Sequence, residues 1–145
     1  MCALQLGAGT GLGSLVAARR GCRAIASDVY PLSLQLISEA AAMGTPPLDV
    51  TPLHLDLFSP TPLPAADLVL AADVLYLTDL TRAVAHRVVE AKARGSTVML
   101  TDSRRTHQGA FLTALEAAGV EAHFEPHRLD WLPGGQTEHA DLLII

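Results

Sequence analysis

The sequence predicts an α/β domain organised around a doubly wound, mostly parallel, seven-stranded sheet. Strand-like and helix-like segments alternate along the chain, a glycine follows each helical segment, and 50% of the 145 residues are hydrophobic. A sheet that helices cover on both faces needs this composition, because its strands are buried on both sides. The length is that of a single domain spanning residues 1–145.

The first half of the chain predicts three strands and two helices. Gly21 and Gly44 should end the helices, because glycine readily adopts the left-handed conformation of a C-terminal cap. Pro31 suits the first position of the second helix, where its missing N–H is not needed. We expect strands at 2–6, 23–27 and 53–57, and helices at 12–20 and from residue 31 to just before Gly44.

The second half predicts four strands and two helices. Pro60, Pro62 and Pro64 indicate that the connection before the fourth strand is stiff and extended. No helix separates the last two strands, so they cannot form a parallel crossover and the last strand should run antiparallel. We expect strands at 67–72, 97–101, 120–125 and 140–145, helices at 77–94 and 109–118, and a loop at 132–138.

Composition argues against several classes of partner. A formal charge of −5 gives no support for nucleic-acid binding, which needs a basic surface. No run approaches the roughly 18 uncharged apolar residues of a membrane span, and no signal-like segment opens the chain. Cys2 and Cys22 are too few for a disulfide framework, although they begin strands that should be neighbours; we expect two small buried hydrophobes. We therefore expect a monomeric, cytoplasmic protein.

A glycine-rich turn follows the first strand and precedes the first helix, an arrangement that brings backbone N–H groups close to a nucleotide. The dinucleotide fingerprint G-x-G-x-x-G/A fits it poorly. The third small position falls on Leu12 when counted from Gly7, and on Ser14 when counted from Gly9. The turn consists of Leu6, Gly7, Ala8, Gly9, Thr10 and Gly11.

An aspartate stands where the second strand ends. Asp28 lies 17 residues after Gly11, and a carboxylate at this place can accept hydrogen bonds from both ribose hydroxyls of a nucleotide. The alternative is that Asp28 caps the helix that begins near Pro31.

The run LVLAADVLY at 68–76 resembles the fourth-strand signature of the protein lysine methyltransferases called methyltransferase family 16. That family carries Asp-x-x-Tyr at this point, which Asp73 and Tyr76 match. The alternating glycines likewise resemble the first motif of class I S-adenosylmethionine-dependent methyltransferases. The resemblance runs from Leu4 to about Leu115, and more loosely to Ile145. It implies a Rossmann-like sheet in the order 3-2-1-4-5-7-6 with strand seven antiparallel.

The resemblance also implies a cofactor and a set of site residues. The cofactor would be S-adenosylmethionine, with Asp56 near the adenine amine, although an acidic residue after a strand is common in any case. Asp73 would orient the acceptor amine or the methionine end of the cofactor, and Tyr76 would wall the lysine channel. The implied cofactor residues are Leu6, Gly7, Ala8, Gly9, Thr10, Gly11, Asp28, Val29, Asp56, Leu57, Ala72 and Asp73.

The implied activity is methyl transfer to an accessible lysine of a protein substrate. The alternatives are a small-molecule N-methyltransferase and a non-catalytic cofactor-binding or scaffold protein. A nicotinamide oxidoreductase is disfavoured by Leu12 and by Asp73-x-x-Tyr76. The family normally carries a lid segment ahead of the first strand, which is missing here, and often an asparagine where Ser38-Glu39-Ala40 stands. We therefore expect a fragment or a more open site.

Methyl transfer needs no metal, and the sequence predicts none. His123 and His127 are four residues apart, but they fall in a predicted strand and loop and would not share a helical face. Arg104 and Arg105 could touch substrate or form a solvated pair. Trp131 could line the acceptor side or cover the core.

Overall fold

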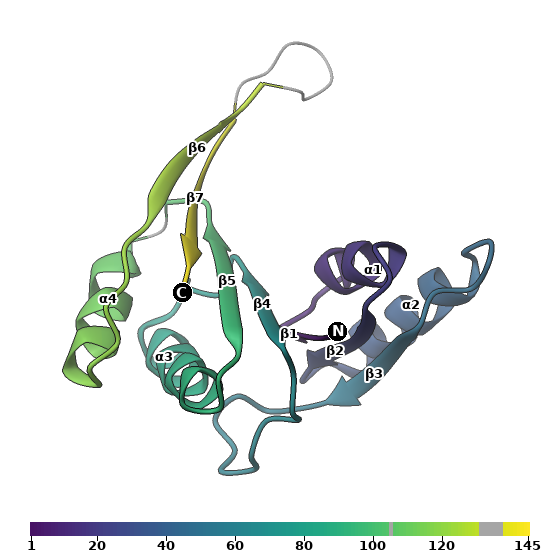
Figure 1. Ribbon diagram of the computed structural model, residues 1–145, viewed down its shortest axis with the longest axis horizontal. Helices are drawn as coiled ribbons and strands as arrows, with labels where there is room; N and C mark the ends of the chain where they lie inside the picture. The colour runs from purple at the N-terminus through teal and green to yellow at the C-terminus, as the bar shows by residue number, and fades with distance from the viewer. Residues whose placement is uncertain (105, 131–137) are drawn as a thin grey trace.

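The computed structural model describes residues 1–104, 106–130 and 138–145 (Figure 1). Helices α1 and α2 lie on one side of the sheet, and α3 and α4 lie on the other. In chain order the elements are β1 (Cys2–Leu6), α1 (Leu12–Arg19), β2 (Arg23–Asp28), α2 (Pro31–Ala42), β3 (Val50–His54), β4 (Leu68–Ala72), α3 (Thr78–Ala93), β5 (Thr97–Asp102), α4 (Gln108–Ala117), β6 (Glu125–Leu129) and β7 (Glu138–Ile144).

These strands form one seven-stranded sheet within the described residues, in the order β3-β2-β1-β4-β5-β7-β6. Strands β1 to β5 pair in parallel. Strand β7 runs antiparallel to both β5 and β6. The predicted fold class, the strand order and the reversed last strand are confirmed.

The main core lies between the sheet and the helices α3 and α4. Alternate residues of each central strand enter it, because successive strand side chains point to opposite faces. Helix residues three or four apart meet them from the other side. The largest buried side chains of this core are Leu4, Leu6, Leu75, Val69, Val84, Val88, Val98, Leu100, Phe111, Leu115 and Leu143.

Two predicted strands are misplaced. The third was expected at 53–57 but spans Val50–His54, because Pro52 is tolerated at the sheet edge, where its missing N–H breaks no ladder. The sixth was expected at 120–125 but spans Glu125–Leu129. The apolar side chains of 120–124 do pack on the core, as the pattern indicated, yet this segment is a connection and the paired strand after it is mostly exposed.

The two cysteines are free thiols. Cys22 is buried, as predicted, whereas Cys2 is half-buried and pairs in register with Arg23 on the neighbouring strand. Across the described ranges, no helix combines the length and apolar composition that crossing a membrane requires.

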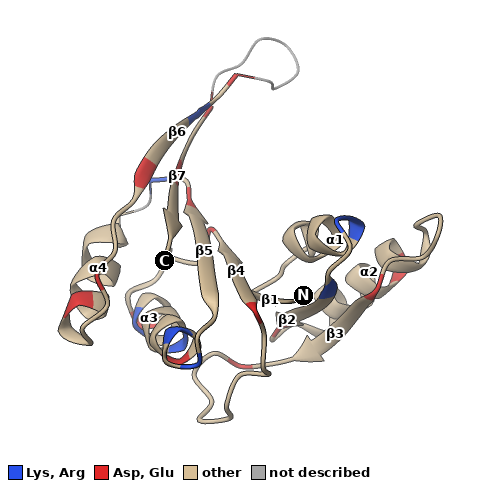
Figure 2. Ribbon diagram, viewed as in Figure 1, with Lys and Arg blue, Asp and Glu red and all other residues tan. Residues whose placement is uncertain are grey.

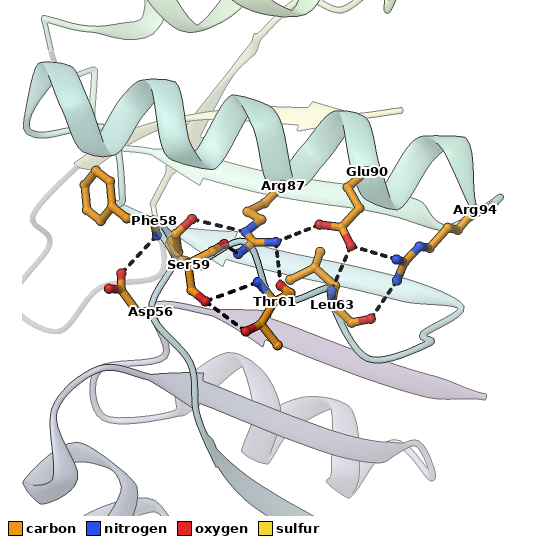
Figure 3. Close-up of polar contacts among 9 residues, drawn as sticks. Asp56, Phe58, Ser59, Thr61, Leu63, Arg87, Glu90 and Arg94 are labelled. Carbon is orange, nitrogen blue, oxygen red and sulfur yellow. Dashed lines mark hydrogen bonds and ion pairs between the residues drawn. The ribbon is translucent and has the colours of Figure 1, made fainter.

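The connection between β3 and β4, residues 55–67, contains no helix or strand and is fastened to α3 by a buried arginine (Figure 3). The Arg87 guanidinium donates to the carbonyl oxygens of Leu57 at 3.1 Å and Thr61 at 2.9 Å, and to that of Ser59. It also pairs with the carboxylate of Glu90 at 2.8 Å. We call residues 55–67 the β3–β4 loop.

Glu90 extends this network along α3, a helix that carries both acidic and basic residues (Figure 2). Its Oε1 accepts from the backbone N–H of Leu63 at 2.8 Å and pairs with Arg94 at 2.9 Å. Arg94 in turn donates to the Leu63 carbonyl at 2.6 Å. Burial alone would raise the pKa of Glu90, but the Leu63 and Arg87 hydrogen bonds and the two guanidinium charges outweigh it, so its pKa lies below 4.5.

We expect Glu90→Gln to lower the melting temperature at neutral pH, and this difference from the wild type to shrink in acid. A lowered native pKa stabilises the fold fully above the unfolded value of 4.5, and that stabilisation is lost as the pH falls through the native pKa. Thermal unfolding followed by circular dichroism across this range measures it. The control is Glu116→Gln, at an exposed glutamate of α4. A difference that stays constant below pH 4.5 would contradict the prediction.

Candidate functional site

The predicted cofactor residues gather at the carboxyl ends of the parallel strands. Ligands of open α/β sheets bind in the crevice at this edge, where the strand order reverses. A cavity of about 320 Å³ lies there. The predicted residues that line it are Gly7, Gly9, Asp28, Val29, Asp56, Leu57, Ala72, Asp73 and Tyr76. We call it the carboxyl-edge cavity.

Four predicted residues of the glycine turn lie outside the carboxyl-edge cavity. Leu6 is fully buried in the core, and Gly11 packs against α2. Ala8 and Thr10 line a second cavity beside the turn. The sequence reasoning missed six lining residues, which are Tyr30, Ser33, Leu55, Phe58, Val74 and Leu80.

The three glycines of the turn have positive φ, a conformation that side chains rarely adopt. A Cβ on Gly11 would lie 2.5 Å from Ile37 Cγ1, and one on Gly7 would lie 3.1 Å from Val74 Cγ1. Those two glycines are therefore required by packing. A Cβ on Gly9, at φ +55°, would meet no protein atom within 4 Å, although Gly9 lines the carboxyl-edge cavity. Gly9 thus leaves space that a ligand can occupy.

Asp28 joins the second strand to the glycine turn. Its side chain is buried, Oδ2 accepts from the N–H of Gly9 at 2.8 Å, and Oδ1 accepts from the N–H of Tyr30 at 2.9 Å. Tyr30 is the N-cap of α2, so the Asp28 bond goes to the N-cap N–H and not to an N–H of the first helical turn, and Asp28 does not cap the helix in the expected way. Each carboxylate oxygen has a second lone pair, which leaves acceptor capacity for ribose hydroxyls.

Asp56 lies two residues beyond β3, at the start of the β3–β4 loop. Its Oδ1 accepts from the N–H of Phe58 at 2.9 Å, which closes a small turn. Phe58 is 61% exposed and lines the carboxyl-edge cavity. An exposed aromatic ring beside a nucleotide site offers a surface on which a planar base can stack. In the sequence, the one indication of this stacking surface is a single aromatic residue two positions after Asp56.

Asp73 lies between the ends of β4 and β5. Its N–H donates to the Thr101 carbonyl at 2.9 Å, and its Oδ1 accepts from the N–H of Ser103 at 2.8 Å. Its φ of +53° is uncommon outside glycine, and such conformations cluster at functional sites. Tyr76, three residues on, is 49% exposed. Both predicted catalytic residues therefore lie at the open rim of the carboxyl-edge cavity.

A second cavity of about 680 Å³ lies beside α1 and the exposed face of β4. It shares Gly7, Gly9, Ala72 and Asp73 with the carboxyl-edge cavity, so the two meet at the glycine turn. Most of the other lining side chains are apolar, among them Leu12, Val16, Leu68, Leu70 and Met99. We call it the α1 cavity.

Other candidate residues lie apart from this site. Arg104 forms an ion pair with Asp141 at 3.0 Å, its side chain is half exposed, and it lines neither cavity. Arg105, Trp131 and most of the predicted loop at 132–138 fall outside the described residues. His123 lies before β6 and His127 within it, and the described ranges hold no group of three or more metal-ligating side chains.

The glycine turn, the carboxylate at the end of β2 and the reversed last strand together define the class I methyltransferase fold. The chain belongs to methyltransferase family 16, whose model is described as "Lysine methyltransferase" and matches residues 1–118. No curated protein matches the chain.

Solved structures share this fold. A TehB-like SAM-dependent methyltransferase from Corynebacterium glutamicum has a TM-score of 0.65 at 15% identity, over 98% of this chain and 78% of that one. A SAM-dependent methyltransferase from Methanosarcina mazei has a TM-score of 0.73 at 13% identity, over 99% of this chain and 90% of that one. Magnesium protoporphyrin IX methyltransferase from Synechocystis, with bound SAM, has a TM-score of 0.69 at 16% identity, over 99% of this chain and 69% of that one.

The protein is therefore an S-adenosylmethionine-dependent methyltransferase. The residues at the carboxyl edge fit this cofactor. Gly9 leaves open space beside a left-handed turn, and the buried carboxylate of Asp28 retains acceptor capacity next to it. Phe58 adds an exposed aromatic ring.

We expect Gly9→Ala to weaken binding of S-adenosylhomocysteine about tenfold or more, because the new methyl group occupies the space that the ligand needs. Gly21→Ala is the matched control. Gly21 also has positive φ with open space around it but lies far from the carboxyl edge. Both variants should lose about 1–2 kcal/mol of stability from the left-handed conformation. Isothermal titration calorimetry measures the affinity, and equal affinity in the two variants would show that Gly9 does not face the cofactor.

Proposed function

We propose that this protein methylates a lysine side chain of another protein. The observation that carries the proposal is the position of Asp73 and Tyr76 at the exposed rim of the carboxyl-edge cavity. A lysine that projects from a macromolecule can reach an exposed rim, whereas a small ligand is normally enclosed over most of its surface. The family's description supports a lysine acceptor.

When bound, S-adenosylmethionine supplies an electrophilic methyl group on a sulfonium centre. The acceptor must arrive as a neutral amine, and a lysine with an unperturbed pKa of about 10.4 is mostly protonated at neutral pH. Desolvation beside the Tyr76 ring would favour the neutral form. The Asp73 carboxylate, held by the Ser103 N–H, would orient the amine or the ammonium of the cofactor's methionine end.

The overall charge is consistent with a basic partner. A net charge of −5 favours the approach of a lysine-rich protein, although such steering is modest at physiological salt.

A small-molecule acceptor is the second candidate, and one observation favours it. The α1 cavity is about 680 Å³, is lined mainly by apolar residues and reaches Asp73. An apolar acceptor of moderate size would fit such a space.

A labelling experiment distinguishes the candidates. The purified protein is incubated with a cell lysate and radiolabelled-methyl S-adenosylmethionine, and labelled protein is hydrolysed to identify the methylated amino acid. We expect methyllysine. Label confined to small molecules would favour the second candidate, and cofactor binding with no label at all would indicate a non-catalytic binder.

We expect Asp73→Asn to reduce this labelling roughly 10- to 100-fold, since a charged hydrogen bond to the amine or cofactor is lost. Asparagine tolerates positive φ and can still accept from Ser103, so the fold should be preserved. Asp79→Asn is the matched control, because Asp79 is an exposed aspartate of α3 whose ion pair with Arg82 lies on the surface. Equal labelling by both variants would remove Asp73 from the mechanism.

A further inference from the structure

Arg87 holds residues 57–61 of the β3–β4 loop by hydrogen bonds to their backbone. Its side chain is 7% exposed, and its three backbone acceptors are the alternate carbonyls of Leu57, Ser59 and Thr61. The guanidinium presents five N–H donors in a rigid fork, so one side chain can hold several carbonyls at once. Figure 3 shows the loop wrapped around this group.

The start of the loop is fixed to the sheet, because the N–H of Leu55 donates to the Asp28 carbonyl at 3.1 Å and the Leu55 side chain is buried in the core. Beyond it, Pro60, Pro62 and Pro64 remove three backbone donors. The bonds of Asp56 with Phe58 and Ser59, and those between Ser59 and Thr61, stay within the loop. Arg87 supplies three hydrogen bonds that fasten this segment to α3.

The segment that Arg87 holds is also a wall of the cofactor site. The carbonyl of Leu57 accepts a hydrogen bond from Arg87, and Leu57 also lines the carboxyl-edge cavity. Its neighbours Asp56 and Phe58 line the same cavity. Arg87 itself does not line that cavity and touches no predicted catalytic residue. Its hydrogen bonds reach the wall of the cavity through the loop, at Leu57.

We propose that Arg87 is a positioning residue for the adenine end of the cofactor. By fixing Leu57 and Ser59, it holds the Asp56 carboxylate and the Phe58 ring where an adenine can contact both. The inference rests on S-adenosylmethionine as the cofactor and is independent of which acceptor is methylated.

Glu90 keeps this arginine in place. It neutralises the buried guanidinium through a 2.8 Å ion pair and is itself anchored by Leu63 and Arg94. A lysine at position 87 would keep the charge but has no planar fork, so it could not satisfy the three carbonyls together. Within the loop, Arg94 bonds to Leu63, a residue beyond the segment that Arg87 holds. Arg94 therefore serves as a control for a loss of loop stability that does not act through residues 57–61.

Two ligands test the proposal by calorimetry. S-adenosylhomocysteine has both ends of the cofactor, whereas 5′-methylthioadenosine lacks the amino-acid end. We expect Arg87→Lys to weaken both ligands by the same factor, about tenfold. Asp73→Asn should weaken only S-adenosylhomocysteine. Arg94→Gln should lower the melting temperature while leaving both affinities within about twofold of the wild type.

A purely structural role for Arg87 predicts a different pattern. In that case Arg87→Lys would lower the melting temperature and leave both affinities unchanged, which would overturn the proposal. If Arg87→Lys does not fold, Glu90→Gln serves instead and should weaken both ligands equally by a smaller factor. Failure of the wild type to bind either ligand would refute the inference together with the cofactor assignment, whereas failure to label lysine would leave it standing.

Discussion

The Asp28 carboxylate is the contact on which the rest of the site depends. It ends the second strand, and its two oxygens hold the N–H groups of Gly9 and Tyr30. One buried side chain therefore sets the distance between the glycine turn and the start of α2. The glycine turn can lie this close to α2 only because Gly11 has no side chain, which would clash with Ile37. A cofactor that binds Asp28 meets a site whose backbone is already in place.

The two ends of the site are supported by different means. At the proposed methyl-transfer end, Asp73 directly follows β4 and bonds to the Thr101 carbonyl in β5 and to the N–H of Ser103 just after β5. At the proposed adenine end, Asp56 and Phe58 lie on the irregular β3–β4 loop. This loop is held by Arg87, which projects from α3. The residues of the proposed mechanism lie at a rigid sheet edge, while the loop proposed to contact the base is fastened separately.

Sequence patterns predicted the features that are local. The buried central strands are apolar runs that stop at or just before Gly7, Asp28 or Asp73, so the position of each strand and the residue at its end could be inferred together. The edge strands β3 and β6 were misplaced, because each pairs with one neighbour only and carries little apolar signal. The role of Arg87 could not be inferred, since its carbonyl partners lie 26 to 30 residues away and are chosen by the course of a loop.

A crystal structure of the protein with S-adenosylhomocysteine tests the site most directly. We expect the ribose hydroxyls on the Asp28 carboxylate, the adenine against Phe58 and Asp56, and the homocysteine directed toward Asp73. The ligand bound in the α1 cavity alone, with no contact to Asp28, would contradict the assignment of the carboxyl edge as the cofactor site.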